Sequence, residues 1–267
     1  MDIFSYQFFI NALTGICIIS VASAIIGTYI VTRRLVSISG GVTHACFGGL
    51  GLGYYLGVSP ILMSAVFAVS SSLLVEAMSR RWRVREDSAI AVIWAIGMAI
   101  GVIFVFMTPG YVPELNSFLF GNILTIKSSD LVMFSIYTIV LIAFFAAFFK
   151  QIIAVAFDRD FATISKLPVT AISLTMTVLI ALCIVLTIKL VGIMLLMSML
   201  SLPQMIAETY CTRFKSMMTA SVIISIFGSV TGLLLSVIVD VPCSALIVTV
   251  FAAMYVISKI ASIWVKR

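Results

Sequence analysis

The sequence predicts an all-α protein, a polytopic transmembrane helix bundle with about eight or nine spans. Of its 267 residues, 63% are hydrophobic and only 10% are charged, and the mean hydropathy is +1.27. Soluble domains are nearer half apolar and a quarter charged, so that class is excluded. One crossing needs roughly 20 apolar residues, which leaves room for little besides the spans. We therefore expect a single transmembrane domain over residues 1–267.

Apolar segments follow one another along the chain, separated by short polar connections. The N-terminal MDIFSYQFF lacks the basic start and cleavage site of a signal peptide, so we expect the first apolar segment to remain in the protein. Few residues divide the sixth segment from the seventh, which leaves eight crossings as the alternative to nine. The expected spans are residues 8–31, 40–57, 59–77, 88–108, 130–149, 170–188, 190–206, 217–238 and 243–264.

Basic residues concentrate in alternate connections. With the N-terminus outside, fourteen of the sixteen Lys and Arg residues fall in cytoplasmic connections or in the tail, and only Lys127 and Lys189 fall outside. This bias predicts a multi-pass protein of the cytoplasmic membrane with a cytoplasmic C-terminus. The net charge of +6 is thus explained by membrane topology, and no nucleic-acid partner is expected.

A glycine-rich segment, residues 33–57, carries the only histidine in the chain. Small residues recur there at every fourth position and would form one helical face on which a neighbouring helix packs closely. His44 lies on the adjacent row between Gly40 and Gly48, so its ring is expected to face open space. Packing alone explains such a row, but an ionisable ring at membrane depth also indicates a functional site. The packing row is Gly41, Ala45, Gly49, Gly53 and Gly57.

Two further glycine pairs occur in later apolar segments. Gly97 with Gly101, and Gly228 with Gly232, predict close helix crossings or a homodimer seam. In the seventh expected span, Pro203 removes one helical hydrogen bond and predicts a kink.

The sequence lacks the motifs of a chemical site of its own. Its five cysteines show neither CxxC nor metal-ligand spacing, and it contains no GxxxxGK[ST], GxSxG or HExxH motif. We therefore expect no enzymatic activity and no permanently bound cofactor. Energy for uphill transport would have to come from another subunit or from an ion gradient.

The cytoplasmic connection at residues 150–170 is longer than a simple turn requires. Within it, Asp158, Asp160 and Ala162 predict a short helix that ends before a proline. Such a helix is either a docking element for a cytoplasmic partner or part of a solvated loop. On the outer side, residues 113–130 are too weakly apolar to span and predict a short interfacial or re-entrant helix.

The chain resembles the membrane permeases of bacterial and archaeal ABC importers for zinc, manganese and iron(II). The similarity covers nearly the whole chain, and six segments carry it in the same order. They are RRLVSISGGVTHACFGGLGLGYYLG (33–57), REDSAIAVIWAIGMAIGVIFV (85–105), SFLFGNILTI (117–126), FDRDFATISKLPV (157–169), GIMLLMSMLSLPQMIAE (192–208) and DVPCSALIVTVFA (240–252).

The resemblance implies a type II ABC importer permease that forms a homodimer or a paired permease in the lipid bilayer. It implies a cytoplasmic ATPase subunit dimer that hydrolyses ATP, and an extracytoplasmic metal-binding protein that delivers the ion. FDRDFA looks like the coupling helix of the family. By that likeness the docking residues are Asp158, Asp160, Phe161 and Ala162.

The family's second helix typically carries an aspartate four residues before its histidine, and both face the path of the transported divalent ion. His44 matches this histidine, whereas Gly40 stands where the aspartate is expected. A carboxylate and an imidazole at this spacing would form half of a divalent-cation site. Without the carboxylate, the His44 side chains of two copies cooperate, another residue substitutes, or the ion crosses with fewer protein contacts.

Two other functions compete with a metal-ion permease. Permeases for a larger metal chelate, a siderophore or a corrinoid, usually have longer chains with about ten crossings. An ion-coupled secondary carrier would need carboxylates within its spans. The carboxylates nearest the expected spans fall instead at span ends, at Glu76, Asp130, Glu208 and Asp240.

Overall fold

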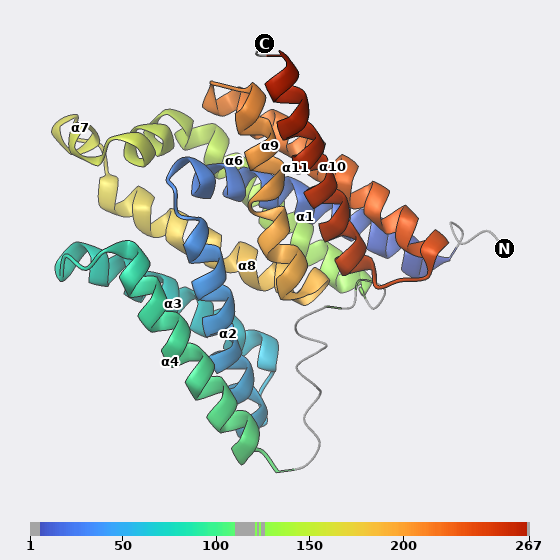
Figure 1. The fold of residues 1–267 in the computed structure, drawn as a ribbon. Coiled ribbons are helices and arrows are strands. Elements are labelled where there is room, and N and C mark those ends of the chain that lie inside the picture. Colours follow the sequence, from blue (N-terminus) through green and yellow to red (C-terminus); the bar gives the residue numbers. More distant parts are fainter. Residues whose placement is uncertain (1–5, 110–120, 122, 124–125, 266–267) are drawn as a thin grey trace. The chain divides into compact units, whose positions relative to one another are not determined.

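The computed structural model describes residues 6–109, 121, 123 and 126–265 of the chain, and the regular elements in this part are all helices (Figure 1). This agrees with the all-α prediction. The helices are α1 (Gln7–Thr32), α2 (Val36–Leu56), α3 (Pro60–Arg81), α4 (Glu86–Met107), α6 (Ser128–Phe157), α7 (Arg159–Ile164), α8 (Val169–Met199), α9 (Leu202–Tyr210), α10 (Phe214–Val239) and α11 (Cys243–Val265).

Seven segments in the described ranges are long and apolar enough to cross a membrane. The helix α2 is not among them, because glycines, serines and His44 lower its hydropathy, but its 21 residues extend about 32 Å and so suffice for a crossing. One of the seven, Val169–Tyr210, has 42 residues, about twice the length of a single span. The helices are thus consistent with the expected eight or nine spans.

The chain divides into two compact units. The first contains Met1–Arg34, Leu115–Phe144 and Thr187–Arg267, and the second contains Leu35–Glu114 and Phe145–Leu186. Both α6 and α8 begin in one unit and end in the other. Each unit is therefore built from segments that are distant in the sequence. Whether the chain acts as one membrane domain stays a prediction.

In the first unit, α10 packs against α1, α9 and α11. A Cβ at Gly232 would lie 2.7 Å from Ile247 Cα, so only a residue without a side chain fits at this crossing of α10 and α11. The pair Gly228 and Gly232 therefore serves a close crossing inside the chain, as predicted. On the α1 side, the Ser20 hydroxyl donates a 3.1 Å hydrogen bond to the Ser229 hydroxyl.

The helix α8 breaks at Gly192, whose φ of 77° and ψ of 176° lie outside the helical region. This break separates the sixth expected span from the seventh. Before it, Lys189 Nζ forms a 2.6 Å ion pair with Asp130 Oδ1 at the start of α6, within the same unit. The two charged groups, expected on the outer side, therefore neutralise each other.

The predicted interruption of the helix near Pro203 is present, because α8 ends at Met199 and α9 begins at Leu202, but the predicted loss of a helical hydrogen bond is not. Pro203 lies in the first turn of the separate helix α9, where its missing N–H leaves no hydrogen bond unmade. The chain has already left α8 at Met199. As for the short helix predicted at residues 113–130, residues 113–120, 122 and 124–125 lie outside the described part of the chain.

The second unit contains a bundle of α2, α3 and α4, in which α2 packs against both of the others (Figure 1). The end of α6, the short helix α7 and the start of α8 complete this unit. Both candidate functional features, the His44 segment and the 150–170 connection, are therefore parts of one compact unit.

Candidate metal path and docking helix

The small residues of α2 lie where the helix contacts its neighbours. A Cβ at Gly49 would lie 2.7 Å from the carbonyl carbon of Met63, and one at Gly53 would lie 2.7 Å from Pro60 Cα, both on α3. A Cβ at Gly41 would overlap the Ile90 side chain of α4. Real Cβ atoms essentially never approach so closely, so a larger residue at Gly49 or Gly53 requires movement of the α3 backbone, and one at Gly41 requires movement of the Ile90 side chain.

Glycines of both helices lie at the crossing of α2 and α4. A Cβ at Gly97 would lie 2.5 Å from Ala45 Cα, and one at Gly48 would lie 2.8 Å from the Gly97 carbonyl oxygen. About one turn further on, a Cβ at Gly51 would overlap the Gly101 carbonyl oxygen, and one at Gly101 would lie 2.6 Å from the Phe47 carbonyl oxygen. The pair Gly97 and Gly101 thus produces a close crossing of α2 and α4 within the chain.

Gly57 has a different place from the other members of its predicted row. It is the C-cap of α2, with a φ of 66° in the left-handed region, and a Cβ there would meet nothing within 4 Å. Its backbone N–H donates to the Tyr54 carbonyl at 3.2 Å. Glycine ends the helix at this position because it adopts the left-handed conformation without a steric penalty.

The His44 side chain does not face open space as the sequence suggested. Its imidazole stacks on the indole of Trp94 from α4, with ring centroids 4.5 Å apart and planes 2° apart. The neighbouring Gly48 position is occupied by contacts with Gly97 and Phe67. His44 is nonetheless only half-buried, so part of the ring stays accessible.

The polar groups next to His44 in sequence are engaged with backbone. The Thr43 hydroxyl donates to the Ser39 carbonyl, and the Ser39 hydroxyl donates to the Val36 carbonyl at 2.6 Å. Gly40 is buried and offers no side chain. Among the described residues, no three His, Cys, Asp or Glu side chains gather in a group able to hold a metal ion. One copy of this unit therefore supplies the imidazole without a complete ligand set.

The short helix expected in the 150–170 connection is present as α7. The Asp158 side chain caps it by accepting a 2.8 Å hydrogen bond from the Phe161 N–H. Ala162 is fully buried, while Phe161 is 59% exposed and Ile164 is 80% exposed. Asp160 is also exposed, in the first turn of the helix. This helix is thus anchored by the buried Ala162, while its two large apolar side chains and the Asp160 carboxylate are exposed.

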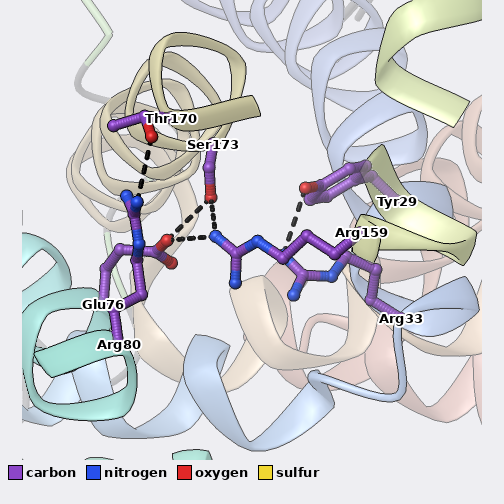
Figure 2. A network of polar contacts seen from close by, with 7 residues as sticks. All are labelled: Tyr29, Arg33, Glu76, Arg80, Arg159, Thr170 and Ser173. Carbon is purple, nitrogen blue, oxygen red and sulfur yellow. Dashed lines mark hydrogen bonds and ion pairs between the residues drawn. The ribbon is translucent and has the colours of Figure 1, made fainter. Parts of the chain in front are cut away.

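Arg159 ties α7 to two longer helices of the same unit (Figure 2). Its guanidinium lies 2.5 Å from Glu76 Oε1 of α3 and donates a 2.7 Å hydrogen bond to the Ser173 hydroxyl of α8. Ser173 in turn donates to Glu76 at 2.8 Å. Glu76 is only 9% exposed, so the Arg159 guanidinium balances the charge of a carboxylate that is largely shielded from water.

A second arginine strengthens the connection between α3 and α8. Arg80 donates a 2.9 Å hydrogen bond to the Thr170 hydroxyl in the first turn of α8 (Figure 2). Arg80, Arg159, Asp160 and Thr170 are among the residues that line an adjoining groove of about 630 Å³. Figure 2 also shows Arg33, the C-cap of α1 in the other unit. Its guanidinium donates a 3.2 Å hydrogen bond to the Tyr29 hydroxyl.

Sequence analysis did not identify the residues that hold these features in place. Trp94 lies 50 residues from His44, and Glu76 lies 83 residues from Arg159, so no local pattern links either pair. One signal was nevertheless available for Glu76. A carboxylate near the end of an apolar helix is expected to have a cationic partner, and Arg159 occupies the next connection expected on the same side.

The chain is similar in sequence to membrane proteins of metal transport systems. The chain is 35% identical to a protein of Chlamydia pneumoniae named "Probable metal transport system membrane protein", over 84% of this chain and 78% of that protein. It is 26% identical to the manganese transport system membrane protein MntC of Halalkalibacterium halodurans, over 96% of this chain and 88% of that one.

A solved structure supports the fold. The structure of PsaBC from Streptococcus pneumoniae in complex with Fab aligns with a TM-score of 0.83 at 25% identity, covering 95% of this chain and 91% of that chain. The sequence profile of the ABC 3 transport family matches residues 5–262. The chain therefore belongs to the ABC 3 transport family.

Proposed function

We propose that this chain is the membrane permease subunit of a binding-protein-dependent ABC importer that moves a divalent transition metal ion across the cytoplasmic membrane. The family match over residues 5–262 supports the transport class, and relatives named for manganese and metal transport support the cargo. The observation that carries the assignment to a metal ion is His44, a half-buried imidazole on a glycine-rich helix. Neutral imidazole is a common ligand of such ions.

The permease is not an enzyme, and ATP is hydrolysed by a separate subunit. The sequence contains no phosphate-binding GxxxxGK[ST] motif. We infer that a dimer of ATPase subunits binds on the cytoplasmic side and that α7 docks into it. The outward Phe161 and Ile164 side chains, beside Asp160, offer an apolar contact with an adjacent charge. The Arg159 contacts transmit force from α7 to α3 and α8.

The remaining partners follow from the class of importer. A second permease copy or a paired permease forms the path, and an extracytoplasmic metal-binding protein delivers the ion. In this arrangement His44 contacts the ion during passage. Because Gly40 supplies no carboxylate, the ion is held by fewer charged ligands, and weak binding favours release.

Uptake of Mn²⁺ and Zn²⁺ into proteoliposomes that contain the permease, its ATPase and its binding protein tests this function. We expect ATP-dependent uptake that falls at least tenfold in His44→Ala, with unchanged assembly. Thr43→Ala is the matched control, since the Thr43 hydroxyl donates only to the backbone of its own helix. Equal uptake by His44→Ala and the wild type over a range of metal concentrations would contradict the role of His44. Uptake of a siderophore or corrinoid complex in place of the free ion would contradict the proposed cargo.

A further inference from the structure

The indole of Trp94 covers one face of the only imidazole in the chain. The two rings are parallel to within 2°, and their centroids are 4.5 Å apart. Trp94 itself remains 44% exposed, and His44 is half-buried. The stack occupies one face of the imidazole and leaves its edge, which carries both nitrogens, clear of the indole.

The close crossing of α2 and α4 sets this stack. Ala45, the residue after His44, lies against Gly97, which is three residues after Trp94. A close approach of the two helix backbones is therefore within one helical turn of both rings. A larger residue at Gly97 would separate the helices and with them the two rings.

A neighbour that stacks on its face suits a histidine that binds a passing ion. Metal ions bind imidazole through the nitrogen lone pairs, which lie in the ring plane, so the indole competes for neither nitrogen. Ligand histidines usually have their orientation fixed by a hydrogen bond from the second nitrogen. In the described part of the chain, the imidazole makes its ring contact with Trp94, and no hydrogen bond or ion pair holds it.

The indole also favours positive charge on its neighbour. Coordination of a divalent ion draws electrons from the imidazole, and the electron-rich face of tryptophan attracts a cationic group more strongly than phenylalanine does. An aliphatic side chain at this position would supply neither the attraction nor a flat surface that restricts rotation of the ring.

We propose that Trp94 is a positioning residue for the transported metal ion, which holds the His44 ring in its binding orientation without touching the ion. It thereby orients the imidazole ligand of α2, on which Gly40 supplies no carboxylate. This inference rests on the proposed function, because it requires that His44 meets the ion.

The fluorescence of Trp94 provides a test that does not depend on transport. The chain has three tryptophans, so a full-length Trp82→Phe and Trp264→Phe variant in lipid nanodiscs retains Trp94 alone. We expect Co²⁺, a paramagnetic quencher that binds imidazole, to quench this fluorescence saturably. Mg²⁺ prefers oxygen ligands and should not do so. The same variant carrying His44→Ala should lose the saturable quenching.

Uptake kinetics in the reconstituted complex supply the second measurement. In Trp94→Leu the apparent KM for Mn²⁺ should rise about 3- to 10-fold with kcat little changed, as expected for loss of one aromatic pair. Trp94→Phe should stay within about 3-fold of the wild type, because a flat ring remains. Ile96→Leu is the matched control on the same exposed helix and should leave KM unchanged. If Trp94→Leu does not assemble, the KM of Trp94→Phe and the Co²⁺ quenching experiment decide whether Trp94 positions His44.

The outcomes separate this inference from the proposed function. An unchanged KM in Trp94→Leu, or absent quenching while His44→Ala abolishes uptake, overturns the role of Trp94 and leaves the proposed function intact. Normal metal uptake by His44→Ala together with absent quenching overturns the roles of both His44 and Trp94, and leaves the proposed import of a metal ion intact. Saturable quenching that depends on His44, with a raised KM in Trp94→Leu and an unchanged KM in Ile96→Leu, supports the proposal.

Discussion

Single glycines decide how closely the helices around His44 approach. At Gly49 the added Cβ would meet the backbone of α3, at 2.7 Å from the Met63 carbonyl carbon and 2.8 Å from Ser64 Cα. A backbone cannot rotate away as a flexible side chain can, so the helices themselves must separate. The requirement for glycine is therefore steric at this position and conformational at Gly57, where φ is 66°.

Substitutions at these two glycines should have opposite severities. Gly49→Leu should destabilise the permease by about 1–3 kcal/mol or more and reduce assembly and uptake, because the overlap is with backbone. Gly57→Asn should be nearly silent, since asparagine tolerates the left-handed conformation and no atom lies near the new Cβ. Thermal unfolding in detergent and size-exclusion chromatography measure both. A Gly49→Leu variant as stable as Gly57→Asn would show that the α2–α3 approach is not required.

For single residues, the sequence predicted which positions of α2 form its packing face, but it did not predict which residues of other helices they contact. A four-residue repeat defines a helical face, and periodicity placed Gly41, Gly49 and Gly53 on one such face together with Ala45. At each of these three glycines an added Cβ would lie within 2.7 Å of a neighbouring helix. The stack on Trp94 depends on the register between two helices, which the periodicity within one helix does not define. The cap at Gly57 was available from the sequence, because glycine commonly follows the last turn of a helix.

The short helix α7 is defined by local chemistry and held by distant residues. Asp158 caps it, as its position before a short helical segment predicts, and Ala162 provides the buried contact. The Arg159 interactions with Glu76 and Ser173 come from helices 83 and 14 residues away. The existence of α7 was therefore predictable, whereas the ion pair that joins it to α3 required the folded structure.

Charge reversal at Asp160 tests docking of α7 without breaking the helix. Asp160→Lys should reduce metal uptake and uptake-coupled ATP hydrolysis at least tenfold while membrane insertion stays normal, because this carboxylate is exposed. Ser165→Ala is the matched control, because Ser165 is the exposed C-cap of the same helix and carries no charge. Asp158→Lys would be a poor test, because it removes the hydrogen bond to the Phe161 N–H as well as the charge.

Co-purification of permease and ATPase, together with ATPase rates in proteoliposomes, provides the measurement. Docking predicts weaker co-purification of Asp160→Lys and normal co-purification of Ser165→Ala. The docking role of α7 would be wrong if both variants retained wild-type association and coupling.

For the molecule as a whole, hydropathy predicted the helical class and the approximate number of spans. It did not predict the two compact units, because α6 and α8 each run from one unit into the other, and their division depends on contacts between segments far apart in sequence. Nor did it define the connection within Val169–Tyr210, where Gly192 breaks the helix and α9 begins separately. The number of crossings depends on this segment.

Cysteine labelling of intact cells resolves the crossing number. In a variant whose five native cysteines are replaced, single cysteines are introduced at Ser165, before the segment, and at Lys215, after it. Both positions are exposed. If Val169–Tyr210 crosses the membrane twice, both cysteines lie in the cytoplasm and resist a membrane-impermeant maleimide until the cells are opened. This result would agree with nine spans and with the concentration of Lys and Arg on the inner side.

The exposed Lys127→Cys serves as the outer control and should react in intact cells, because it lies in a connection expected outside. Lys266→Cys should be protected if the C-terminus is cytoplasmic. Reaction at Lys215→Cys with protection at Ser165→Cys would mean that Val169–Tyr210 crosses once. The chain would then have eight spans, and the basic residues after α9 would lie outside, against the charge bias from which the topology was inferred.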